Sequence, residues 1–164
     1  MISQTTRKII PALFALAASS VAQAHTGHGT ESLMEGLSHP LGLDHLLAML
    51  AVGLWSAKHL SMRDAWQGPA TFMTALFFSA VLGHSGFAAS WMETAIAGSV
   101  VLFGLMLVGQ QAFGKLTGLT LIATAAALHG LAHGAETPDS GFVTYAIGFM
   151  VTTACLHISG LSLG

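Results

Sequence analysis

Five apolar runs, each close to the length of a membrane-spanning helix, constrain this chain more than any other feature. They cover about 41–57, 69–89, 92–112, 116–133 and 141–163. The hydrocarbon core of a bilayer requires about 20 apolar residues in a helix. The runs are too long for strands of a membrane barrel and lack their alternation of apolar and polar residues. The sequence therefore predicts an all-α fold, a polytopic transmembrane helix bundle of about five spans.

The charge content agrees with a lipid bilayer as the surroundings of the chain. Charged residues make up 7% of the sequence, against about 25% in a soluble domain. The formal net charge is −2, which leaves no basic surface for nucleic acid. The single cysteine, Cys155, cannot close an internal disulfide or build a cysteine-rich zinc site. We find no convincing nucleophile or base beside the histidines, and therefore predict no enzyme. The leading function described below requires no organic cofactor, and none is expected for it.

The first 24 residues have the pattern of a cleavable signal peptide. Arg7 and Lys8 precede a short apolar stretch, and Ala22-Gln23-Ala24 has the small residues of a cleavage site. An uncleaved first helix is the alternative. Cleavage after Ala24 would leave residues 25–164 as a single transmembrane domain. Its free N-terminus would carry His25 and His28, which we consider either a metal-capturing pair or a flexible polar end.

Basic residues predict how the bundle is oriented. If the mature N-terminus is periplasmic, the first span runs inward and Lys58 and Arg63 lie in a cytoplasmic loop. The third span then also runs inward and places Lys115 on the same side. The loop from Glu136 to Asp139 falls outside and contains no Lys or Arg. All three basic residues of the mature chain thus follow the positive-inside rule.

The main chemical signal is a surplus of nine histidines, because ionisable groups are costly inside a bilayer. The segment His39-Pro40-Leu41-Gly42-Leu43-Asp44-His45 opens the first span. His39, Asp44 and His45 offer imidazole nitrogen and carboxylate oxygen, which suit nickel, cobalt, zinc or iron better than calcium. The alternative is that Asp44 caps the helix start and the histidines lie in the headgroup region.

A second motif ends the fourth span. His129, His133 and Glu136 are spaced i, i+4 and i+7, so they share one helical face. Gly130 and Gly134 form a neighbouring stripe of small residues where another helix can approach closely. Together these residues predict a metal-binding face, with two hydrogen-bonded polar residues inside the bundle as the alternative.

Depth in the membrane links further candidates to these motifs. In the predicted topology, His84 and Glu93 lie at the same outer level as both motifs. His157 lies deeper in the last span, where it is either a relay for the ion or a buried histidine donating to a backbone carbonyl. The candidate metal residues are therefore His25, His28, His39, Asp44, His45, His84, Glu93, His129, His133, Glu136 and His157.

At these motifs the sequence resembles the HupE/UreJ family of small bacterial membrane proteins. Matching segments are Gly42-Leu43-Asp44-His45-Leu46-Leu47-Ala48-Met49, His129-Gly130-Leu131-Ala132-His133-Gly134-Ala135-Glu136 and Leu156-His157-Ile158-Ser159-Gly160. The resemblance implies a nickel permease-like protein of the bacterial inner membrane that serves hydrogenase or urease maturation. Family members usually continue into one more helix, so we expect this chain to be about one span short.

These observations support one leading function and two alternatives. The leading hypothesis is uptake of a divalent transition metal from periplasm to cytoplasm, with nickel as the transported substrate and cobalt also open. One alternative is an accessory protein that binds metal without transporting it. The other is a haem b membrane protein, because histidines from separate helices can ligate haem iron. Hydrogenase or urease maturation proteins and a second copy of the chain are the expected partners.

Overall fold

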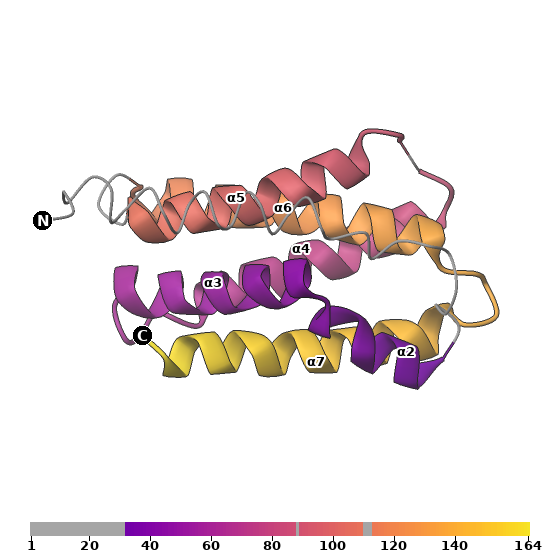
Figure 1. The fold of residues 1–164 in the computed structure, drawn as a ribbon, viewed down its shortest axis with the longest axis horizontal. Coiled ribbons are helices and arrows are strands. Elements are labelled where there is room, and N and C mark those ends of the chain that lie inside the picture. Colours follow the sequence, from indigo (N-terminus) through magenta and orange to yellow (C-terminus); the bar gives the residue numbers. More distant parts are fainter. Residues whose placement is uncertain (1–31, 88, 110–112) are drawn as a thin grey trace, which may run out of the picture.

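The computed structural model describes residues 32–164, except residues 88 and 110–112 and the side chain of Glu93. The signal-peptide prediction, His25 and His28 lie outside these residues. All regular elements in the described part are helical (Figure 1). They are α2 (Leu33–Ser38), the 3₁₀ helix η1 (His39–Leu41), α3 (Leu43–His59), α4 (Gln67–His84), α5 (Met92–Val108), α6 (Lys115–Glu136) and α7 (Phe142–Ser162).

Each predicted apolar run overlaps one of the helices α3 to α7, and the boundaries differ in places. The second run was predicted to extend to residue 89, whereas α4 ends at His84. Gly86 has a φ of 103°, a left-handed conformation that glycine adopts readily and other residues rarely do. This turn explains why the helix stops although the sequence remains apolar. In contrast, α6 continues to Glu136, three residues beyond its predicted end at 133.

Not all of these helices are long enough to cross a bilayer by themselves. By length and composition, α6 and α7 qualify in the described part of the chain. The pair formed by Leu33–Leu41 and Leu43–His59 also qualifies when taken as one span with a 72° bend. The apolar part of α5 is shorter. The fold is thus an all-helical membrane-type bundle with two or three helices of spanning length.

Glycines hold α4 and α6 in close contact. A Cβ atom at Gly130 would collide with Ser79 and with the carbonyl of Leu76, and one at Gly134 would collide with the carbonyl of Ala80. Small residues of this kind let the backbones of membrane helices approach. The stripe of small residues predicted beside the histidines therefore packs against another helix, which is α4.

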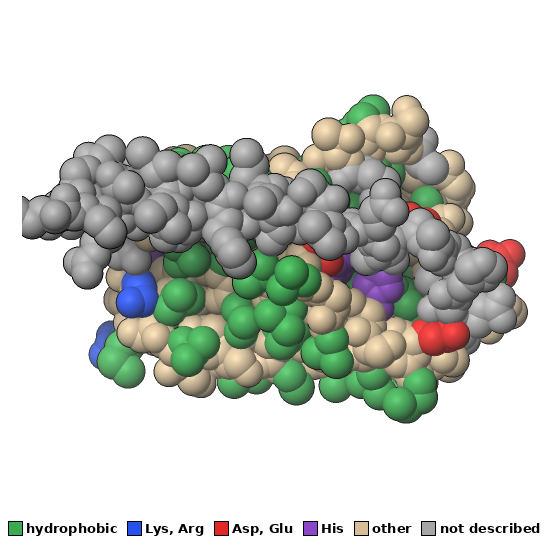
Figure 2. Space-filling view, in the orientation of Figure 1, with side chains coloured by type: hydrophobic (Ala, Val, Ile, Leu, Met, Phe, Trp, Pro, Cys, Tyr) green, Lys and Arg blue, Asp and Glu red, His purple; other side chains and the backbone are tan. Residues whose placement is uncertain are grey.

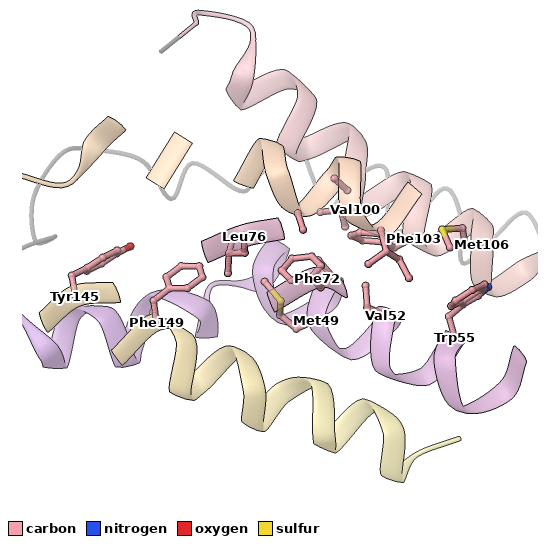
Figure 3. Close-up of a cluster of buried hydrophobic side chains, with 14 residues drawn as sticks. Met49, Val52, Trp55, Phe72, Leu76, Val100, Phe103, Met106, Tyr145 and Phe149 are labelled. Atoms are coloured by element: carbon pink, nitrogen blue, oxygen red, sulfur yellow. The ribbon is translucent and has the colours of Figure 1, made fainter. Parts of the chain in front are cut away.

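An apolar core fills the space between the helices (Figure 3). Phe72 of α4 lies at its centre and is fully buried. Met49 and Trp55 from α3 and Phe103 from α5 also belong to this core and are at most 2% exposed. Tyr145 and Phe149 of α7 extend it toward the end of the bundle where α3 begins. The helices that carry the candidate histidines, α3, α6 and α7, therefore each contribute side chains to this packed core.

The two ends of the bundle differ in charge. In Figure 2 the basic side chains in view lie at one end, and acidic side chains lie toward the other end, near the visible histidine surface. At the basic end, Lys115 Nζ donates to Asp64 Oδ2 at 2.9 Å. This hydrogen bond from Lys115 holds the pKa of the Asp64 carboxyl below its usual value. It also joins the loop after α3 to the start of α6, so Lys115 lies at the same end as that loop, as its sequence position predicted.

Candidate metal centre

A break in the chain at Gly42 brings His39 beside the start of α3. The backbone of Gly42 is extended, with φ −55° and ψ 141°, and it separates two helical segments that meet at 72°. Pro40 lies in the first turn of η1, where its missing N–H costs no hydrogen bond. Because of this bend, His39 folds back toward the helix that follows it.

The short helix α2 fixes His39 against α7. Ser32 and Glu35 form a capping box at its start, which satisfies two backbone N–H groups. A Cβ at Gly36 would collide with the carbonyl of Tyr145, so α2 and α7 are in backbone contact. Thr152 Oγ1 also donates to the carbonyl of Leu37 at 2.8 Å. Sequence analysis did not predict α2, although the Ser-x-x-Glu pattern of the capping box was a visible signal.

Asp44 and His45 lie in the first turn of α3, and both are buried. Asp44 Oδ1 is 2.9 Å from His45 Nδ1, and the two side chains are 7% and 0% exposed. Histidines that bind metal commonly direct their second ring nitrogen to a carboxylate, which fixes the ring and increases its basicity. Asp44 is therefore positioned to orient His45 and to leave Nε2 directed into the bundle.

His45 Nε2 meets a histidine from the last turn of α6. The distance from His45 Nε2 to His133 Nε2 is 2.7 Å, which is a hydrogen bond with one ring as donor and the other as acceptor. On its other side, His133 Nδ1 lies 3.8 Å from Glu136 Oε2. Two imidazoles from α3 and α6 are thus in direct contact, and a carboxylate lies beyond each of them.

His39 completes a cluster of three imidazoles. Its ring centroid is 5.0 Å from that of His45 and 4.7 Å from that of His133. One ligand atom from each of these histidines lies within 4.8 Å of the others. Phe149 packs beside all three rings, at 5.1 to 6.1 Å. An apolar wall therefore borders the cluster on the α7 side.

The spacing of the cluster fits a transition-metal ion after small side-chain shifts. Imidazole nitrogens bind such ions at about 2.0–2.1 Å, so two ligands of one ion are at most about 4.2 Å apart. The observed limit of 4.8 Å requires a modest inward movement. The His45–His133 hydrogen bond must also open by a few tenths of an ångström to admit an ion. Three imidazoles form a donor set suited to nickel, cobalt, copper or zinc.

His129 lies one turn deeper in α6 than His133. Its ring is fully buried and 5.2 Å from that of His45. Its Nε2 is 2.8 Å from Ser99 Oγ of α5, and Ser99 also donates to the carbonyl of Ile96 at 2.7 Å. Because the Ser99 proton goes to that carbonyl, its oxygen can accept from His129. Sequence analysis did not single out Ser99, because one serine in an apolar helix carries no recognisable pattern.

His84 does not join the cluster, although its predicted depth in the membrane had suggested that it would. His84 Nε2 lies 3.1 Å from Asp139 Oδ1, and its ring stacks on Phe142 at 4.0 Å. The position of His84 around the bundle directs its ring to the loop after α6 and not to the cluster. Glu93 lies in the first turn of α5, and its side chain is outside the described part of the structure.

His157 is buried deep in α7 and apart from the three-histidine cluster. It is 1% exposed, and its Nδ1 lies 2.9 Å from the carbonyl of Thr153, one turn earlier. This is the backbone hydrogen bond that the sequence left open as one of two interpretations. The ring of Phe72 lies 5.0 Å away, measured between centroids.

Comparison with known proteins identifies the family. The family model described as HupE / UreJ protein matches residues 13–164. The chain belongs to the HupE/UreJ family. It is 38% identical over 158 residues to Protein HupE of Rhizobium leguminosarum bv. viciae, an alignment that covers 95% of this chain and 82% of that protein. No solved structure matches the chain significantly. Membership agrees with the resemblance seen in the motifs, and the family is one of membrane accessory proteins for hydrogenase or urease.

Proposed function

We propose that this protein carries a divalent transition-metal ion, with nickel as its substrate, across the bacterial inner membrane for hydrogenase or urease maturation. One observation supports this most directly. His39, His45 and His133 come from three separate elements, and one ligand atom of each lies within 4.8 Å of the others. Chance burial of histidines does not explain such convergence, because each isolated polar side chain carries a desolvation cost.

In this proposal the chain crosses the membrane five times, with the mature N-terminus in the periplasm. The three-histidine cluster then lies near the periplasmic surface of the membrane, and the Lys115–Asp64 pair lies on the cytoplasmic side. A hydrated ion arriving from the periplasm would exchange water for imidazole nitrogen at the cluster. Asp44 would hold the ring of His45 and balance part of the positive charge. Glu136 is 36% exposed beside His133, and it would attract the cation to the site.

Radioactive nickel accumulation in whole cells tests this function. The host is a bacterium without its own high-affinity nickel uptake, expressing wild type, Asp44→Ala, His133→Ala or His59→Ala. His59 lies at the opposite end of α3, where it stacks on Trp55 at 4.9 Å, so it controls for the loss of a histidine elsewhere. We expect wild type and His59→Ala to accumulate nickel and the other two variants to fall to the level of empty cells.

Normal nickel accumulation in both Asp44→Ala and His133→Ala would contradict the mechanism. Competition by unlabelled cobalt, zinc and iron in the same assay defines the metal preference. Saturable nickel binding by purified wild type, with none reaching the lumen of proteoliposomes, would favour a metal-binding accessory protein instead. A Soret absorption band in the purified protein would favour the haem alternative.

A further inference from the structure

Four buried rings form a continuous series from the outer cluster toward the interior. The ring centroid of His45 is 5.2 Å from that of His129, and His129 is 6.0 Å from Phe72. Phe72 is in turn 5.0 Å from His157. The four side chains come from α3, α6, α4 and α7, and none is more than 1% exposed. Only Phe72 in this series cannot bind a metal ion.

The hydrogen bond of His157 fixes which of its nitrogens can act as a ligand. The Thr153 carbonyl can only accept, so His157 Nδ1 carries the hydrogen and donates it across the 2.9 Å contact. In the neutral ring, Nε2 then bears a lone pair. His157 Nε2 is buried and makes no hydrogen bond within the described residues. A backbone carbonyl on one nitrogen and a lone pair on the other is the arrangement typical of metal-binding histidines.

The position of His157 along the bundle places it well below the outer cluster. A Cβ at Gly53 would collide with the carbonyl of His157, so these two residues are at the same level. Gly53 is eight residues after His45 in α3. At 1.5 Å per residue, this is about 12 Å along the helix axis. His157 is therefore too far away to bind the same ion as His45 and would hold an ion at a separate position.

Phe72 separates the two levels. Its side chain is 0% exposed, and it lies in the apolar core with Met49 and Leu76 (Figure 3). An ion leaving His129 for His157 would meet this ring, which offers no ligand and leaves no exposed surface for water. Passage requires the ring to rotate or the helices to part. The ring of Phe72 is thus the apolar group that lies between His129 and His157.

We infer that His157 Nε2 is an inner binding position for the transported metal ion, and that the Phe72 ring is the barrier between it and the outer cluster. This inference rests on the proposed transport function. It assigns His157 a role in movement of the ion, not in its capture. The alternative is a buried histidine that merely satisfies the Thr153 carbonyl and packs against Phe72.

The test measures nickel binding and nickel flux on the same purified full-length variants. Equilibrium binding of radioactive nickel in nanodiscs reports the outer cluster, and accumulation in proteoliposomes reports passage. For His157→Leu we expect binding within about twofold of wild type, because the outer cluster is distant, and flux reduced by roughly tenfold or more. For Phe72→Ala we expect unchanged binding and a severalfold increase in flux. His59→Leu is the matched control and should match wild type in both measurements.

Each result bears on a different part of the inference. Wild-type flux in His157→Leu would overturn the inner position, and so would an equal loss of binding and flux, which indicates a structural role. Unchanged or reduced flux in Phe72→Ala would overturn the barrier. Circular dichroism establishes that the variants fold. If His157→Leu does not fold, His157→Asn replaces it under the same criteria. Absence of lumenal nickel with wild type would instead contradict the proposed transport function itself.

Discussion

At the scale of single residues, the three-histidine cluster combines imidazoles with carboxylates that lie behind them. Asp44 contacts His45 on the ring nitrogen directed away from His133. This order makes the carboxylate an orienting group for one histidine, although its oxygens are also ligand atoms by chemistry. The role of Asp44 can therefore be measured separately from that of the imidazoles.

Asp44→Asn should weaken nickel binding by about 10–100-fold, the usual cost of losing a carboxylate behind a metal-binding histidine. The substitution keeps the size of the side chain and removes its charge. Isothermal titration of nickel into the purified protein measures the change. Asp139→Asn is the matched control, because Asp139 is fully exposed and pairs with His84 outside the cluster. Equal affinities for Asp44→Asn and wild type would show that the carboxylate has no part in binding.

At the scale of helices, the glycine contacts between α4 and α6 determine where His129 and His133 lie. Gly130→Ala should destabilise the protein by about 1–3 kcal/mol, as expected when a methyl group is forced into a packed contact. The added Cβ would collide with backbone as well as with Ser79, and backbone cannot rotate away. Thermal unfolding in detergent checks this prediction.

Gly104→Ala in α5 is the matched control for Gly130→Ala. A Cβ at Gly104 would meet no atom within 4 Å, so the substitution should leave the unfolding temperature unchanged or raise it. An unfolding temperature for Gly130→Ala equal to that of this control would mean that α4 and α6 are not in backbone contact.

The sequence predicted where the helices lie along the chain, but it did not predict which helices pack against each other. Apolar length predicted α3 to α7, because each buries its backbone polar groups within itself. The i, i+4 spacing placed His129 and His133 on one face, and the structure has both rings buried there. Depth alone could not tell that His84 faces Asp139 instead of His133. Which helices are adjacent depends on contacts such as Gly130 with Leu76, and a single sequence does not encode them as a readable pattern.

At the scale of the whole molecule, the bundle has a basic end and a histidine-rich end (Figure 2). If these ends face cytoplasm and periplasm, a cysteine at position 139 should react with an impermeant thiol reagent in intact cells. A cysteine at position 63 should react only after the membrane is opened. Both Asp139→Cys and Arg63→Cys require Cys155→Ser as background, because Cys155 is exposed. If the cysteine at position 63 reacts in intact cells and the one at position 139 reacts only in opened cells, the topology and the direction of transport are the reverse of those proposed.

The basic end should also respond to acid in a defined direction. The pKa of Asp64 is lowered by its hydrogen bond from Lys115. Asp64 therefore stabilises the fold above its unfolded pKa of about 3.9, and this contribution is lost as the pH falls through the lower folded pKa. In Lys115→Met the pKa of Asp64 should return toward its ordinary value. The carboxyl carbon chemical shift of Asp64, measured by NMR during a pH titration, gives this pKa in wild type and in the variant. Identical titration curves for the two proteins would contradict the pairing of Asp64 with Lys115.

The bend at Gly42 has a mechanical consequence. His39 opens η1 directly after α2, and both α2 and α3, which bears His45, pack on α7. His133 belongs to α6, which packs on α4. An ion held by all three imidazoles would link the group formed by α2, α3 and α7 to the pair formed by α4 and α6. Movement of one group relative to the other would pull an imidazole away from the ion. The affinity for such an ion and the arrangement of the helices would then be coupled, so that a shift between the two groups of helices would release the ion.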